Sequence, residues 1–171
     1  MTPARLAATA LTAAVTLAPS MAPSLAHAQD RCISRADSQA VVAYLMPDLV
    51  DRAAKRCAPL LGQSYLGDRG GALAERMSPL SRAAWPDARR ALERQSGTSL
   101  PDGGILVDIG RAAIADGITQ ELDRESCEVL DQMLIHLEPL PPENLANVFA
   151  LFLEAGMNND PDAALRVCPV G

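Results

Sequence analysis

Four cysteines, at positions 32, 57, 127 and 168, are the residues whose type and spacing point most directly to chemistry. The segments between them hold 24, 69 and 40 residues, so no two cysteines have the spacing typical of a redox-active pair or a zinc ribbon. All four follow a segment with the layout of an export signal, and an even number of cysteines in an exported protein favours disulfides. We therefore expect two structural disulfides and no metal site.

The pairing of the cysteines depends on how the chain behaves at Pro47. A straight helix between the first two cysteines would hold them more than about 30 Å apart, whereas a disulfide needs Cα atoms within about 7 Å. If Pro47 breaks this helix, its halves can fold back on each other, which favours Cys32–Cys57 with Cys127–Cys168. If Pro47 only kinks the helix, the expected pairing is Cys32–Cys168 with Cys57–Cys127.

Other residues with catalytic potential do not form a recognised set. His136 is the one histidine after residue 28, and no nucleophile is spaced to meet it. The segment from Gly62 to Gly67 holds a serine between glycines, but it is one residue longer than a nucleophile elbow and lacks the preceding strand. We interpret His136 as a residue near a helix end and Ser64 as a loop serine.

Acidic residues near the C-terminus fit only part of a calcium loop. Asn158, Asp160 and Asp162 occupy its first, third and fifth positions. Ala163 then stands where the loop needs glycine, and Pro169 stands where it needs a bidentate glutamate. The pattern therefore predicts a turn followed by a short helix.

A second acidic run lies between residues 121 and 131, where Glu121, Glu125 and Glu128 share one helical face. Paired carboxylates can perform acid–base catalysis when their environments separate their pKa values, although a solvated face is the ordinary role of such a run. No phosphate loop, dinucleotide fingerprint or metalloprotease motif is present in the sequence, and we expect no cofactor.

The elements that would position these residues are all predicted to be helices. Apolar residues recur with helical period, and Ser34 and Asp123 are suitable N-caps. The expected fold is all-α, a single irregular bundle of about six to eight helices, stapled by disulfides. The expected helices cover residues 34–46, 48–57, 72–77, 79–95, 105–120, 123–137 and 142–155, with a short last one from 160 to near Cys168.

Two of these helices have distinctive apolar surfaces. Residues 105–120 are apolar almost all round, which predicts a central buried helix, although a strand over 105–109 is an alternative. The helix over 142–155 has an apolar surface wider than one packing partner needs. We expect this helix and its neighbour to provide the surface for a partner or ligand, formed by Met133, Leu145, Val148, Phe149 and Phe152.

The N-terminal residues 1–28 have the layout of a secretory signal peptide. Arg5 precedes an apolar stretch from Leu6 to Ala18, and Ala26-His27-Ala28 ends the segment as a cleavage site. That stretch is shorter than the roughly 20 residues that span a bilayer, and no apolar run after residue 28 is long enough. We expect cleavage after Ala28, a periplasmic or secreted protein, and one helical domain over 29–171.

Charge is unevenly distributed along this acidic chain, whose formal net charge is −6. Residues 29–94 hold 11 basic and 8 acidic side chains, and residues 95–171 hold 3 and 13. We therefore expect no nucleic-acid partner, because binding nucleic acid needs clustered positive charge. The asymmetry suits a basic partner or self-association, or simply keeps the protein soluble.

These features together favour a non-enzymatic interaction protein of the bacterial envelope that binds a protein partner or forms a homodimer. The alternative is a carrier that holds a small apolar molecule between the helices 105–120, 123–137 and 142–155. An enzyme that uses carboxylates alone is the second alternative.

Overall fold

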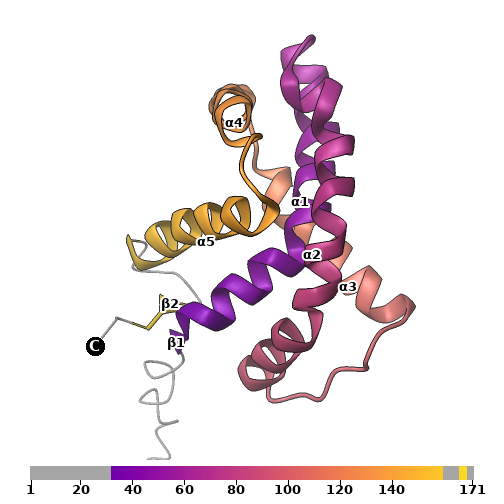
Figure 1. Ribbon diagram of the computed structural model, residues 1–171, viewed down its shortest axis with the longest axis vertical. Coiled ribbons are helices and arrows are strands. Elements are labelled where there is room, and N and C mark those ends of the chain that lie inside the picture. The colour runs from indigo at the N-terminus through magenta and orange to yellow at the C-terminus, as the bar shows by residue number, and fades with distance from the viewer. Residues whose placement is uncertain (1–31, 160–165, 169–171) are drawn as a thin grey trace, which may run out of the picture.

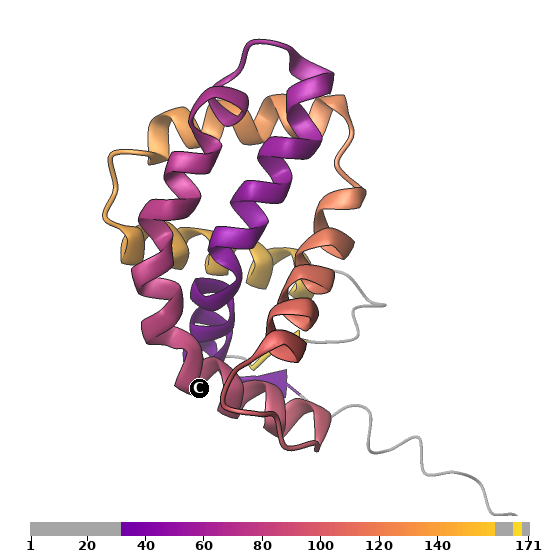
Figure 2. The same cartoon turned by 90° about the vertical axis from the view of Figure 1, so that its right-hand side faces the viewer.

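The computed structural model describes residues 32–159 and 166–168, in which five helices and two short strands follow one another. Figure 2 shows α1, α2 and α3 side by side, with α4 and α5 running across behind them. The all-α class is confirmed, but six to eight helices were expected. The elements are β1 (Cys32–Ile33), α1 (Arg35–Leu61), α2 (Tyr65–Ser96), α3 (Ile105–Gln120), α4 (Arg124–Leu137), α5 (Pro142–Asn159) and β2 (Arg166–Val167).

The helix count is lower because four prolines lie inside continuous helices. Pro47 and Pro59 are within α1, and Pro79 and Pro86 are within α2. An interior proline removes one backbone hydrogen bond and kinks a helix, and α1 bends midway along its length (Figure 1). The helix continues beyond the bend because Met46 and Val50, on either side of Pro47, are both buried in the core.

The two long helices form a hairpin whose turn is set by Gly62 and Ser64. Gly62 adopts a φ of 73°, which favours glycine, and its N–H donates to the carbonyl of Ala58. The Ser64 hydroxyl accepts from the N–H of Gly67 and so caps α2. The two helices approach closely at Gly70, where there is no room for a side chain. A Cβ at this position would lie 2.5 Å from the Cβ of Ala54.

The main core lies where α4 and α5 cross the α1–α2 hairpin. Its largest fully buried side chains include Met46, Leu66, Met77, Leu134 and Leu145. The N-cap expected at Asp123 is present, since its carboxylate accepts from the N–H of Ser126 at 2.8 Å. α4 is therefore placed by a cap at its start and by apolar burial along its length.

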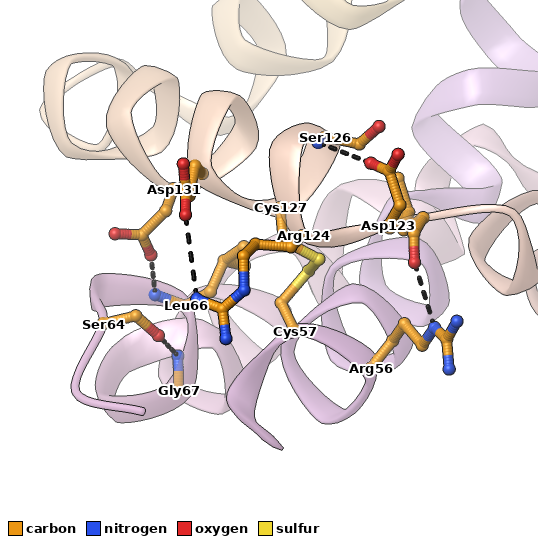
Figure 3. Close-up of a disulfide and its surroundings, with 12 residues drawn as sticks. Arg56, Cys57, Ser64, Leu66, Gly67, Asp123, Arg124, Ser126, Cys127 and Asp131 are labelled. Carbon is orange, nitrogen blue, oxygen red and sulfur yellow. Dashed lines mark hydrogen bonds and ion pairs between the residues drawn. A yellow bond between two sulfur atoms is a disulfide. The ribbon is translucent and has the colours of Figure 1, made fainter. Parts of the chain in front are cut away.

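The disulfides join Cys32 to Cys168 and Cys57 to Cys127, with Cα–Cα distances of 4.9 and 5.5 Å. The favoured pairing of Cys32 with Cys57 and Cys127 with Cys168 is wrong, and the alternative holds. The reason is that α1 only bends at Pro47, so its length separates Cys32 from Cys57. Cys57 and Cys127 are fully buried and tie α1 to α4 (Figure 3).

The Cys32–Cys168 disulfide ties the described C-terminal residues to the start of the fold. β1 and β2 pair in parallel, with Ile33 opposite Val167, and Cys168 N–H donates to the Ile33 carbonyl at 2.9 Å. The predicted short helix from residue 160 lies largely outside the described residues, and its end at 166–167 is β2 instead. Strand pairing and the Cys32–Cys168 disulfide therefore join the same two chain segments.

The predicted signal peptide and the predicted cleavage site after Ala28 lie outside the described residues. Among the residues that the structure describes, none of the helices combines the length and apolar character needed to cross a bilayer.

Candidate functional site

α3 turns its charged side toward the protein. Arg111 Nε lies 2.7 Å from Asp48 Oδ2 on α1, and Asp116 pairs with Arg52, also on α1. Of the residues in α3, only Ala115 and Thr119 are buried. The expectation of a central buried helix over 105–120 is therefore wrong. Two ion pairs and a narrow buried strip that includes Ala115 hold α3 against the protein, and most of its apolar side chains stay exposed.

The opposite side of α3 is apolar and largely exposed, and one edge of it lines a pocket shared with α2. We define the outer face of α3 as Leu106, Ile109, Gly110, Ala113, Ile114 and Gly117. Leu106 is 74% exposed and Ile109 58% exposed, and every residue of this face is classed as exposed. A Cβ added at Gly110 or Gly117 would meet nothing within 4 Å. This arrangement reverses the usual amphipathic helix, whose apolar stripe faces the core.

An apolar pocket of about 520 Å³ opens along one edge of this face. Leu106, Gly110 and Ile114 of α3 form one wall, and Trp85 and Leu92 of α2 form the opposite wall. Leu100 and Pro101, from the segment that joins α2 to α3, close one end. We call this the α2–α3 pocket.

Tyr44 and Trp85 form the aromatic part of the pocket, with ring centroids 4.7 Å apart. The Arg111 guanidinium lies 5.2 Å from the centroid of the Tyr44 ring, within the range of a cation–π contact. Burial raises the pKa of the Tyr44 phenol, and the nearby positive charge of Arg111 acts in the opposite direction. The pocket therefore has aromatic surface, aliphatic walls and one guanidinium. This composition suits the binding of an apolar molecule.

The segment between α2 and α3 is held over the pocket by polar contacts to α2. Trp85 Nε1 donates to the carbonyl of Asp102 at 2.6 Å, and Arg89 pairs with the Asp102 carboxylate. The Leu100 N–H donates to the Glu93 carboxylate at 2.8 Å. This segment, which lies between the expected helices 79–95 and 105–120, thus has a defined position relative to Trp85.

A smaller apolar pocket of about 190 Å³ lies on the other edge of α3, among α1, α4 and α5. Its lining includes Ile118, Leu130, Phe149 and Leu153. It lies between the three helices that were expected to hold an apolar ligand. The larger pocket was missed, because two of its walls come from α2 and the segment that follows α2.

One of the residues predicted to form a partner surface is not on the surface. Leu145 is fully buried in the main core, so it is wrongly placed among them. Met133, Val148 and Phe149 are half-buried, and Phe152 is 56% exposed. Leu151, also exposed on α5, was not predicted.

Two aspartates within the acidic run over 121–131, and the hydroxyl of Ser64, have structural contacts. Asp131 is buried and accepts from the Leu66 N–H at 2.7 Å, which fixes the start of α2 against α4 (Figure 3). Hydrogen bonds from the Ser126 backbone and side chain hold the pKa of Asp123 below its usual range, as expected for a helix cap. Ser64 caps α2.

The remaining candidates for catalysis are exposed, and they take no part in the contacts of Asp131, Asp123 and Ser64 described above. His136 is exposed in the last turn of α4, and Glu121, Glu125 and Glu128 are exposed. Within residues 32–159 and 166–168, no group of three or more metal-ligating side chains comes together. Comparison of the chain with protein families, curated proteins and solved structures finds no match.

Proposed function

We propose that this chain is a non-enzymatic interaction protein of the bacterial envelope, and that a protein partner docks on the outer face of α3. The placement outside the cytoplasm follows from the signal-like N-terminal sequence, and the two disulfides support it. The partner surface differs from the one expected on α5, because α3 carries more of the exposed large apolar side chains, including the two most exposed, Ile105 and Leu106.

The observation that carries this proposal is the reversed orientation of α3. A helix that serves only the fold gains stability by burying its apolar side, at about 25 cal/mol for each Å² removed from water. α3 instead exposes Ile109 and Ile114. Its charged residues Arg111 and Asp116 form ion pairs with α1. Contiguous exposed apolar surface of this kind marks interaction sites in soluble proteins.

A site-specific photo-crosslink tests this proposal. A photoreactive amino acid replaces Ile109 in the full chain, and the matched control carries it at Arg82, which is exposed on α2. The proposal predicts a discrete protein adduct from position 109 in the producing cells, and none from position 82. Absence of any discrete adduct from position 109, with the variant exported and folded, would contradict docking on this face.

A second candidate function, the carrier of a small apolar molecule, is favoured by the α2–α3 pocket. Its volume of about 520 Å³ lies within the range of about 300–1,000 Å³ typical of ligand sites. Trp85 lines this pocket and is the one tryptophan of the chain, so its fluorescence reports occupancy directly. A long-chain alcohol serves as the apolar probe.

Two glycine substitutions give the carrier test a matched pair. Gly110→Phe places a ring in the pocket wall, whereas Gly117→Phe lies on the same helix outside the pocket lining. A carrier predicts that the alcohol changes Trp85 emission saturably in the wild type and the Gly117 variant, and not in the Gly110 variant. An unsaturable response, or an equal response in all three proteins, would contradict the carrier function.

A further inference from the structure

The partner that docks on the outer face of α3 is, we infer, a second copy of this chain, with its α3 lying antiparallel to the first. This inference rests on the proposed docking function and names the partner. A twofold axis passes between Ala113 and Ile114, so each copy contributes the same surface. Such isologous interfaces are the commonest in soluble oligomers.

The order of large and small residues along α3 supports this choice, because it repeats in reverse about that axis. Gly110 and Gly117 are equally distant from the point between Ala113 and Ile114, and so are Ile109 and Ile118. In an antiparallel pair, Gly110 of one copy therefore faces Gly117 of the other. Ile109 comes level with Ile118 of the second copy, on the opposite flank of the contact.

The shape and charge of this face suit the same partner. Both glycines have open space where a Cβ would lie, so the two helices can approach closely at these positions, while exposed Ile109 and Ile114 can pack beside the contact. No acidic or basic residue belongs to the outer face, because Arg111 and Asp116 are paired with α1. An uncharged apolar helix is thus the complementary surface, and α3 of another copy is one.

Cysteine crosslinking tests the arrangement, because the four native cysteines are all in disulfides. Ala113→Cys places a thiol beside the twofold axis, where Cα atoms of two copies fall within the roughly 7 Å that a disulfide allows. Gln120→Cys is the matched control on the same helix. Its two copies lie about 20 Å apart along the helix axis in the antiparallel pair. Both positions are exposed.

The inference predicts that the wild-type protein sediments with about twice the mass of one chain, and that mild oxidation crosslinks the Ala113 variant but not the Gln120 variant. Gly117→Phe places a ring in the contact between the two helices, so this variant should contain more monomer than the wild-type protein at the same concentration. Equal crosslinking of both cysteine variants would overturn the antiparallel arrangement.

A monomer at every concentration up to ~1 mM, the weak end of specific association, would overturn the second copy as partner. This outcome separates the inference from the proposed function on which it rests. A photo-adduct from position 109 with the mass of a different protein would leave docking on α3 intact and exclude the second copy.

Discussion

Arg111 of α3 and Asp48 of α1 form an ion pair, with 2.7 Å between Nε and Oδ2, and this pair sets which side of α3 faces the protein. The same guanidinium lies over the Tyr44 ring. With these contacts made, most of the apolar side of the helix is left exposed, and one edge of it lines the α2–α3 pocket. The proposed docking surface is thus a consequence of where the charges of α1 and α3 meet.

Loss of the Arg111 contacts is expected to loosen α3 selectively. Arg111→Met keeps the length of the side chain but removes the ion pair and the cation–π contact, which together contribute about 1 kcal/mol at a partly exposed site. Amide hydrogen exchange should quicken over residues 105–120 and stay unchanged in the α1–α2 hairpin. Arg82→Met, at an exposed position of α2, is the control. Uniformly faster exchange throughout the chain would contradict a selective role.

The close contact of α1 with α2 gives a prediction with an adjacent control. Gly70→Ala should lower the free energy of unfolding by about 1–3 kcal/mol, because the new Cβ would meet the Cβ of Ala54 at 2.5 Å. Gly71→Ala, at the next position of the same helix, has open space around its Cβ and should stabilise by up to about 1 kcal/mol. Denaturant unfolding measures both. Equal effects of the two substitutions would show that the helices do not meet at Gly70.

The fold predicts a pH dependence at Asp37, which Arg94 Nη2 contacts at 2.6 Å between the start of α1 and the end of α2. Burial alone would raise the pKa of Asp37, but hydrogen bonds from Arg94 and Ser34 outweigh it and lower the pKa. A carboxyl whose pKa is lowered on folding stabilises the protein above its unfolded pKa of about 3.9 and loses this effect as pH falls through the folded pKa.

Asp37→Asn should therefore destabilise the protein by up to about 1 kcal/mol at neutral pH, since Asp37 is partly solvent-exposed. The difference from the wild type should shrink toward zero below about pH 4. Glu75→Gln, at an exposed position of α2, controls for the loss of one negative charge. A difference that persists unchanged into acid would assign the effect of Asp37 to packing instead of charge.

The two disulfides should differ in their contribution to stability. Replacing both Cys57 and Cys127 by Ala removes a link between α1 and α4 that is fully buried, and should cost about 2–4 kcal/mol or more. Replacing Cys32 and Cys168 should mainly free the short strand pair, because Cys32 is exposed. Unfolding of each double variant measures the cost. A non-reduced peptide map that linked Cys32 to Cys57 would contradict the pairing itself.

The helical class and several boundaries of this fold are predictable from sequence because they depend on local chemistry. Ser34 and Asp123 cap helices as expected, each accepting from the N–H three residues on, and Gly97 ends α2 with a positive φ. The loop around residues 97–104 follows from its glycines and proline. In each case the interacting residues lie within a few positions of one another.

The cysteine pairing and the direction of α3 depend on residues far apart in the chain, which local patterns do not relate. Pro47 suggested a break, and only the burial of Met46 and Val50 on both sides shows why α1 continues. The almost wholly apolar α3 suggested a core helix. Its orientation is decided by Asp48 and Arg52, more than 60 residues before their partners.

Solvent accessibility at Ile109 tests most directly whether the outer face of α3 is a docking surface. Ile109→Cys is treated with a maleimide in the producing cells and, separately, as dilute purified protein, with Arg82→Cys as the exposed control on α2. Docking predicts that the thiol at position 109 reacts in the dilute protein and is protected in cells, while the thiol at position 82 reacts in both. Equal labelling of position 109 in both settings would contradict the proposed function.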